Sequence, residues 1–369
     1  GFIDMKKTAL RWFVFMMVSS SILLAACGSS PAAGDGPGSL EITDTTGHTV
    51  TLDGLPQEIA IAGKASVMVQ DAAFMFDEAD QRVKALENRN QSVFDFLPVV
   101  DPTIDEKDLF ERDAGPEQIA AVKPDLVLMK NFNKNKLGDS VEKLGIPVLY
   151  LNLETPDVFY QDIQMLGKVF GVPERAEEII RFYKDRVEKV QEITADLEEG
   201  EKPRVLILRY SDQGGDFAFS VPPESWLQTQ MVEIAGGRPV WVDQGGSGGW
   251  SIVNFEQIAA WDPDQIYLVD YKGDADEVVR RLKEDALWGS LSALKEGQLY
   301  AFAFDFYSWD QPDTRWVLGL EWLATKIHPE RADGIDILAE VDAFYDVLYR
   351  LDQESIQEDV LPKLRGDIP

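Results

Sequence analysis

One block of sequence occurs twice in this chain, and this repeat constrains the fold more than any other feature. Residues 117–130 read EQIAAVKPDLVLMK, and residues 256–269 read EQIAAWDPDQIYLV. Each copy has Glu-Gln-Ile-Ala-Ala, two variable residues, Pro-Asp and an apolar run. The pattern predicts a short helix, a turn and a buried strand, so one supersecondary unit is used twice, 139 residues apart. We therefore expect two similar halves.

The first residue of the repeat is a glutamate in both copies, and local structure does not require it. Pro-Asp suits the turn that each unit needs, so turn chemistry explains that part of the pattern. Within each helix the isoleucine is expected to face the core, which leaves Glu117 and Glu256 exposed. Two lobes joined by a stiff element would place these carboxylates on one side of the molecule.

Helical and strand-like segments alternate on both sides of one long helical pattern. This pattern runs from Pro173 to Gly200, and about 25 residues of helix span roughly 37 Å. Such alternation predicts an α/β fold with largely parallel sheets. We divide the chain into a lobe at 40–165, a connecting helix within 166–200, and a lobe at 201–369.

The only cysteine, Cys27, ends a segment with the three-part layout of a secretory signal. Three basic residues precede an apolar stretch at 12–24, which is short for a membrane span, and two alanines precede the cysteine. LAAC resembles the lipobox of bacterial lipoproteins, which implies that the Cys27 thiol is acylated and begins the mature chain. Residues 28–39 predict a flexible tether. Residues 1–4, upstream of Met5, look like an over-called start.

Composition excludes several classes of function. The chain has 35 basic and 65 acidic residues, a net charge of −30, so nucleic acid and anionic membrane surfaces would repel it. We attribute the acidity to solubility, although an acidic patch could also meet a basic partner. A mature chain without cysteine has no disulfide, cysteine nucleophile or thiolate metal site. Its two histidines, His48 and His328, are far apart, and no catalytic pair is apparent, so we predict neither a metal site nor an enzyme.

The carboxyl ends of the expected strands supply the candidate ligand-binding residues, since ligands of open α/β sheets bind there. Trp250 and Trp309 lie in expected loops, where flat apolar rings are hard to explain by packing. Arg209 and Arg315 could meet anionic groups of a ligand or pair with the abundant carboxylates. The full candidate set is Lys64, Lys130, Arg209, Tyr210, Trp250, Tyr271, Tyr307, Trp309 and Arg315.

The motifs together resemble the helical-backbone class of substrate-binding proteins, which serve bacterial ABC importers of ferric siderophores, heme and cobalamin. They are the signal with its lipobox, ITDTTGHTVTL, EQIAAVKPDLVL, LGIPVLYLN, the long helix, MVEIAGGRPVW, FEQIAAWDPDQIYLV and LGLEWLATKIHPE. They cover nearly all of the mature chain in order. The resemblance implies two Rossmann-like lobes joined by one long rigid α-helix, with the ligand cleft between them.

The resemblance also implies that Glu117 and Glu256 pair with arginines of a permease dimer, which works with a cytoplasmic ATPase. Two carboxylates at a fixed distance suit recognition by two guanidinium groups. We therefore expect an extracytoplasmic, monomeric lipoprotein, anchored to the cell membrane by its lipid, that captures a metal chelate without catalysis or cofactor. An aromatic site favours an iron(III)-siderophore. Cobalamin and heme are the alternatives within this class, with Tyr210, Tyr271 or Tyr307 as iron ligands for heme. A lipid-anchored sensor or interaction protein is the alternative of another class.

Overall fold

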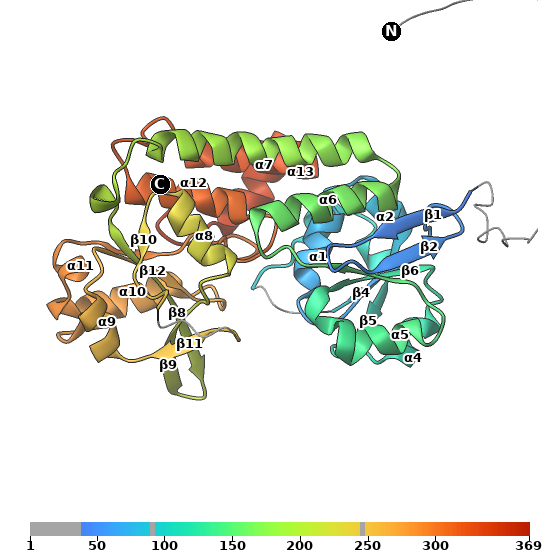
Figure 1. Ribbon diagram of the computed structural model, residues 1–369, viewed down its shortest axis with the longest axis horizontal. Coiled ribbons are helices and arrows are strands. Elements are labelled where there is room, and N and C mark those ends of the chain that lie inside the picture. Colours follow the sequence, from blue (N-terminus) through green and yellow to red (C-terminus); the bar gives the residue numbers. More distant parts are fainter. Residues whose placement is uncertain (1–37, 89–92, 244–247) are drawn as a thin grey trace, which may run out of the picture. The chain divides into compact units, whose positions relative to one another are not determined.

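A computed structural model describes residues 38–88, 93–243 and 248–369, which belong to one compact unit. The predicted lipidation site Cys27 and the predicted tether up to residue 37 lie outside the described residues. Within the compact unit, two separate β-sheets form two lobes, and the long helix α7 (Pro173–Thr194) runs past both of them (Figure 1).

The first lobe begins with an antiparallel hairpin and continues with a parallel sheet in the order β5-β4-β3-β6-β7. The hairpin is the one expected from LEITDTTGHTVTL. The strands are β1 (Leu40–Thr43), β2 (Thr49–Leu52), β3 (Ile59–Ile61), β4 (Val83–Glu87), β5 (Asp108–Phe110), β6 (Leu126–Lys130) and β7 (Val148–Leu151). The helices are α1 (Ser66–Ala73), α2 (Glu78–Arg82), α3 (Leu97–Val100), α4 (Pro116–Ala121), α5 (Asp139–Glu142) and α6 (Pro156–Phe170).

The second lobe has a mixed sheet in the order β11-β9-β8-β12-β13, and the short β10 pairs with β8. Strands β8, β12 and β13 are parallel, whereas β9 returns antiparallel to β8. The strands are β8 (Arg204–Gln213), β9 (Asp216–Val221), β10 (Arg238–Pro239), β11 (Ser251–Val253), β12 (Gln265–Val269) and β13 (Leu299–Ala301). The helices are α8 (Leu227–Ile234), α9 (Phe255–Trp261), α10 (Ala275–Glu284), α11 (Ser292–Lys295), α12 (Trp316–Ile327), α13 (Ile337–Tyr349) and α14 (Gln353–Ser355).

The sequence repeat occupies equivalent places in the two sheets. In the first lobe, edge strand β5 leads through α4 into β6, which lies between β3 and β7. In the second lobe, edge strand β11 leads through α9 into β12, which lies between β8 and β13. The two lobes are therefore built on one plan, and they differ mainly at β9. This strand forms a hairpin with β8, whereas β4 in the same place of the first sheet runs parallel to β3.

The connecting helix is shorter than predicted, because the segment 166–200 contains parts of two helices. Helix α6 ends at Phe170, where Gly171 takes a left-handed conformation with φ of +73°, and Pro173 begins α7. Helix α7 ends at Thr194 and packs against α6 and α12. Its expected apolar stripe is confirmed, since Ile179, Ile180 and Tyr183 are buried. One apolar core extends from the first lobe through α7 into the second.

Among helices of the described residues, none has the length and apolar character needed to cross a bilayer.

Glu321 is a fully buried carboxyl group in α12. Neither of its oxygens has a hydrogen-bond partner in the described part of the chain. The Nε atom of Arg186 lies 3.8 Å away, and that guanidinium is already paired with Glu340 at 2.8 Å. Burial is the main cause that raises the pKa of Glu321 to about 8, and the charge of Glu340 adds to it. Glu321 is therefore mostly protonated at neutral pH.

This carboxyl group should make the stability of the protein depend on pH. The folded protein keeps the proton up to about pH 8, whereas the unfolded chain releases it near pH 4.5, so the free energy of unfolding should fall between these values as pH rises. Glu321→Gln removes this dependence. We expect its thermal midpoint to exceed that of the wild type by roughly 2 °C or more at pH 8, and the difference to shrink toward pH 4.5.

Calorimetry between pH 4.5 and 8.5 measures this difference. Asp333→Asn, at an exposed acid, is the matched control and should follow the wild type at every pH. A difference between Glu321→Gln and the wild type that does not change with pH would contradict the prediction.

Candidate functional site

Two of the predicted ligand residues, Trp250 and Tyr271, lie around a third, Arg209 of β8, and the three come from separate segments. The guanidinium carbon of Arg209 lies 5.3 Å from the ring centroid of Trp250 and 5.3 Å from that of Tyr271. The rings of Trp250 and Tyr271 meet edge to face at 6.1 Å, and Trp226 meets Trp250 in the same way at 6.0 Å. We call Arg209, Trp226, Trp250 and Tyr271 the arginine–aromatic cluster.

The charge of Arg209 is held by aromatic rings instead of by a carboxylate. The side chain is half-buried, and among the described residues no carboxylate forms an ion pair with it. A guanidinium that lies against indole and phenol rings, and whose N–H groups form no ion pair, can donate charge-assisted hydrogen bonds to an anionic group of a ligand.

Tyr271 is fixed by a buried polar network behind the cluster. Its hydroxyl donates to Oδ2 of Asp310 at 2.9 Å and accepts from the side chain of Gln311. Asp310 also accepts from Ser308 at 2.5 Å and from Gln228 at 3.1 Å. Burial, followed by the charge of Asp310, raises the pKa of Tyr271 well above its ordinary value. The ring therefore stays a neutral phenol, oriented by its hydroxyl.

Arg315 pairs with carboxylates, which is one of the two roles expected for it. It is fully buried, with Nε 2.7 Å from Asp305, and Nη1 2.8 Å from Asp313 and 2.5 Å from Asp71. Asp71 belongs to α1 of the first lobe, so this guanidinium joins the lobes. Burial, followed by the charge of Asp313, raises the pKa of Asp71. Arg315 is thus the centre of a buried ion-pair cluster, and its contact with a ligand stays a prediction.

Three further predicted residues are buried. Trp309 is 0% exposed, and its backbone oxygen would lie only 2.2 Å from a Cβ at position 319, so the loop packs directly on the glycine of α12. Lys130 is also 0% exposed and is paired with Glu154 at 2.8 Å. Tyr307 is buried as well. All three side chains therefore contribute to the packed interior of the protein, and their contact with a ligand stays a prediction.

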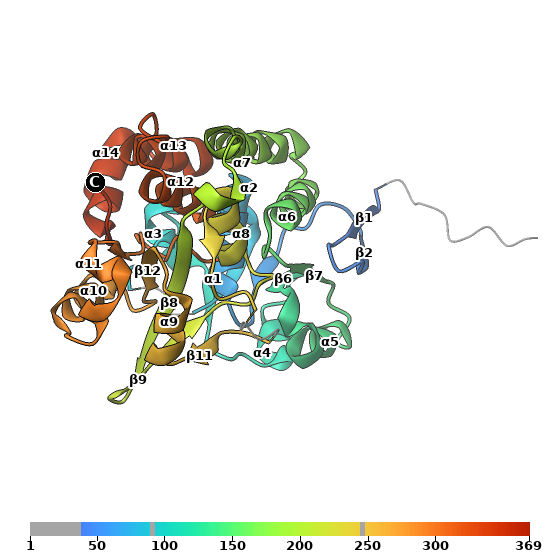
Figure 2. The same cartoon turned by 60° about the vertical axis from the view of Figure 1, so that its left-hand side comes forward.

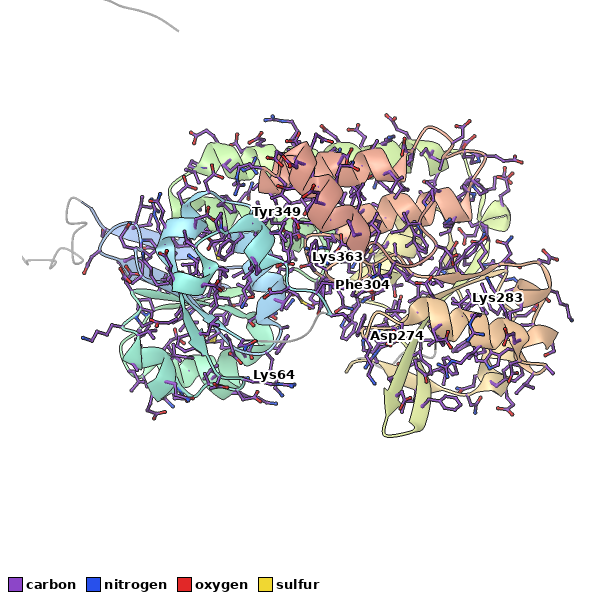
Figure 3. The ribbon with its side chains drawn as sticks, turned by 180° about the vertical axis from the view of Figure 1, so that it is seen from behind. Lys64, Asp274, Lys283, Phe304, Tyr349 and Lys363 are labelled. Atoms are coloured by element: carbon purple, nitrogen blue, oxygen red, sulfur yellow. The ribbon has the colours of Figure 1, made fainter. Side chains whose placement is uncertain are left out.

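Tyr210 and Lys64 are separate from the cluster. Arg209 and Tyr210 are neighbours on β8, so their side chains point to opposite faces of the sheet. Tyr210 packs with Phe217 and Phe219, and the guanidinium carbon of Arg281 lies 5.5 Å from its ring centroid. Lys64 follows β3 and is exposed (Figure 3). Its backbone N–H donates to the side chain of Asn133 at 2.9 Å.

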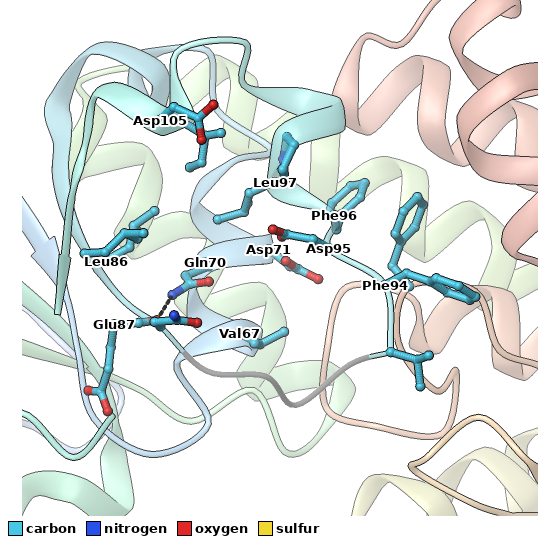
Figure 4. A pocket seen from close by; sticks show the side chains of 16 residues that line it. Val67, Gln70, Asp71, Leu86, Glu87, Phe94, Asp95, Phe96, Leu97 and Asp105 are labelled. Carbon is cyan, nitrogen blue, oxygen red and sulfur yellow. Dashed lines mark hydrogen bonds between the residues drawn. The ribbon is translucent and has the colours of Figure 1, made fainter. Parts of the chain in front are cut away.

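A cavity of about 500 Å³ lies beside α1 and α3 and reaches Phe306 of the second lobe (Figure 4). Its walls combine aromatic rings with carboxylates, and they include Phe94, Phe96, Phe306, Asp71, Asp95 and Asp105. Burial raises the pKa of Asp95, as does the charge of Asp105. The cavity residues of the first lobe were not among those predicted, because the segment 93–97 does not directly follow an expected strand. Among the described residues, His, Cys, Asp and Glu nowhere gather in a group of three that could hold a metal ion.

The repeated glutamates are placed alike. Glu117 and Glu256 are each the second residue of their helix, and both are exposed, while Ile119 and Ile258 are 0% exposed. The following glutamine caps the helix in each copy: its side chain accepts from the backbone N–H of residue 115 at 2.8 Å, or of residue 254 at 3.0 Å. Local structure therefore uses the glutamine and the isoleucine of the repeat and leaves both glutamates free of a capping role.

The two arginines should contribute very different amounts to stability. Arg315→Met leaves three buried carboxylates without their cation and should cost about 3–5 kcal/mol of unfolding free energy at pH 7. Arg209→Met removes a half-buried cation that has no ion pair and should cost less than about 1 kcal/mol. Urea unfolding followed by circular dichroism measures both values. Equal losses in the two variants would contradict the separate roles.

Comparison with known proteins shows which family has this sequence and fold. The sequence profile of the family described as periplasmic binding protein matches residues 50–305. An uncharacterised ABC transporter substrate-binding lipoprotein of Bacillus subtilis, YvrC, is 23% identical over 338 residues, which are 88% of this chain and 99% of that protein. The iron-uptake system-binding protein of the same species is 22% identical over 315 residues, covering 82% and 92% of the two chains.

A solved structure shows the same fold. Molybdate-bound MolA of Haemophilus influenzae superposes with a TM-score of 0.71 at 19% identity, covering 85% of this chain and 98% of that one. The profile match spans more than half of the chain and includes both copies of the internal repeat. The chain belongs to the periplasmic binding protein family.

Proposed function

We propose that this protein, a substrate-binding protein of an ABC transporter, captures an anionic iron(III)-siderophore-type chelate outside the cytoplasm and delivers it to its permease. The family and the named relatives support the transport role, and those relatives are binding proteins. The chelate binds at the arginine–aromatic cluster, and the protein works as a monomer. Cys27 carries the lipid that holds the protein at the membrane.

The arrangement of Arg209 between Trp250 and Tyr271 carries this proposal. A negatively charged ligand would gain a charge-assisted hydrogen bond from the guanidinium without having to displace a carboxylate. The edge-to-face rings of Trp226 and Trp250 offer flat apolar surface to an aromatic chelating group. A ferric siderophore would use both the positive charge and the aromatic surface of the cluster, whereas a ligand with only one matching property would use half of the site.

The alternatives use fewer of these contacts. A bare oxyanion such as molybdate, which is bound in the structure of MolA, would use Arg209 but leave the aromatic rings uncovered. Heme would need an axial ligand, and Tyr271 is neutral and already bonded to Asp310. Cobalamin would cover the rings but supplies less negative charge to Arg209. Cobalamin remains the second candidate.

Tryptophan fluorescence tests the site. The chain from residue 28 is titrated with ferric catecholate and hydroxamate siderophores, cyanocobalamin, hemin and molybdate. We expect saturable quenching by a ferric siderophore, and Arg209→Gln should weaken its binding about tenfold or more, because the charge-assisted bond is lost. Arg280→Gln, at an exposed arginine of α10, is the matched control and should bind within twofold of the wild type. Quenching by molybdate alone, or unchanged affinity in Arg209→Gln, would contradict the proposed ligand.

Docking through the repeated glutamates is a separate part of the proposal. Glu117 and Glu256 should pair with basic residues on the permease, so the double variant Glu117→Gln, Glu256→Gln should associate with the permease–ATPase complex about tenfold more slowly at low salt. Its association rate should also depend less on ionic strength. Surface plasmon resonance with the complex in nanodiscs measures both effects. The double variant Glu177→Gln, Glu188→Gln, on the exposed face of α7, is the control, and an equal loss there would point to net charge alone.

A further inference from the structure

The hairpin of β8 and β9 extends beyond the rest of the second sheet. Pairing between β8 and β12 ends at Arg209, whereas pairing between β8 and β9 continues to Gln213 and Asp216. Pairing between β9 and β11 reaches Phe219, so residues 211–213 and 216–218 form a two-stranded ribbon, closed by Gly214 and Gly215, which have φ of +68° and +96°. Figure 2 shows this ribbon projecting from the lobe.

The ribbon holds an exposed aromatic ring in a fixed position. Phe217 is 64% exposed, yet its ring stacks on Tyr210 at 6.1 Å and meets Phe219 at 6.0 Å. Phe219 in turn packs on Trp288 at 4.8 Å. Nζ of Lys272 also donates to the backbone oxygen of residue 212 at 2.8 Å, which ties the ribbon to the loop after β12. An exposed phenyl ring with one orientation loses little entropy when a partner covers it.

The ribbon points in the same direction as the repeated glutamates. Helices α4 and α9 start just after the carboxyl ends of β5 and β11, and both strands run parallel to the central strands of their sheets. The turn at 214–215 lies past the carboxyl end of β8, so it is at the same edge as Glu256. In Figure 1, α4, α9 and the β8–β9 hairpin all lie on the side away from α7. This side carries one repeated glutamate on each lobe, and the second lobe adds the ribbon with its exposed Phe217.

We propose that the ribbon is a third contact with the permease, in which Phe217 enters an apolar recess on the extracytoplasmic surface of the permease dimer. This inference rests on the proposed function. The acidic pair is matched between the lobes and suits two equivalent subunits, whereas the ribbon has no counterpart in the first lobe, where β3 and β4 are parallel. The ribbon therefore contacts one permease subunit and makes the complex asymmetric. A buried aromatic anchor supplies affinity, while the exposed charges mainly guide association.

Binding of the full-length protein to the permease–ATPase complex in nanodiscs tests this contact. Phe217→Ser should weaken equilibrium binding about tenfold through faster dissociation, and Phe217→Leu should recover most of the loss. Leu144→Ser is the matched control, because Leu144 is 49% exposed and precedes β7 at the opposite edge of the first sheet. It should bind within twofold of the wild type. Thermal midpoints of all variants show that they are folded.

Two outcomes would overturn the inference, and they are distinguishable from failure of the proposed function. If Phe217→Ser binds like the wild type while the Glu117 and Glu256 double variant does not, the ribbon contact is wrong and docking stands. If sedimentation shows that Phe217 mediates self-association and permease binding is unchanged, the ribbon contacts a second copy of the chain. If the wild type does not bind the complex at all, the docking proposal and this inference fail together.

Discussion

The guanidinium of Arg315 joins the two lobes, and the arrangement of the rest depends on it. It pairs with Asp71 of α1 in the first lobe and with Asp305 and Asp313 in the second. Removing such a cluster of ionisable groups from water is costly, and the three close Arg–Asp contacts offset part of this cost. Asp313 Oδ2 and Arg315 Nη2 have no hydrogen-bond partner among the described residues. The ring of Phe96, with its centroid 4.4 Å from the guanidinium carbon, closes the cluster from the first lobe.

Further hydrogen bonds at the carboxyl end of α1 also join the first lobe to the rest of the molecule. Arg175 of α7 donates to the backbone oxygen of Met75, and so does Arg350 after α13. The Tyr349 hydroxyl donates to the backbone oxygen of Asp71. Moving the first lobe relative to α12 and α13 would leave buried polar groups without partners. A frame held in this way keeps the spacing between Glu117 and Glu256 nearly constant, which is what recognition by a dimeric partner requires.

The repeat and the helical pattern predicted the fold well, because both depend on local periodicity. Ile119 and Ile258 are buried and the adjacent glutamates exposed, as the 3.6-residue period requires. The prediction of individual ligand residues was weaker. Arg209 and Arg315 look alike in the sequence, each basic and next to an aromatic residue, yet one lies against rings and the other is surrounded by carboxylates. No local pattern shows which distant side chains reach a guanidinium.

The amino-acid sequence by itself determined two α/β lobes of one plan, a long helix beside them, and a matched pair of exposed glutamates. These features follow from periodicity and turn chemistry within short segments. Only the tertiary structure decided that Trp309 is core and Trp250 is not, and that Asp71 pairs across the lobes. It also decided that β9 turns back to carry Phe217 beyond the sheet. Burial and ion pairing depend on which segments meet, and contacts between residues more than 200 positions apart leave no local trace, as Asp71 and Arg315 show.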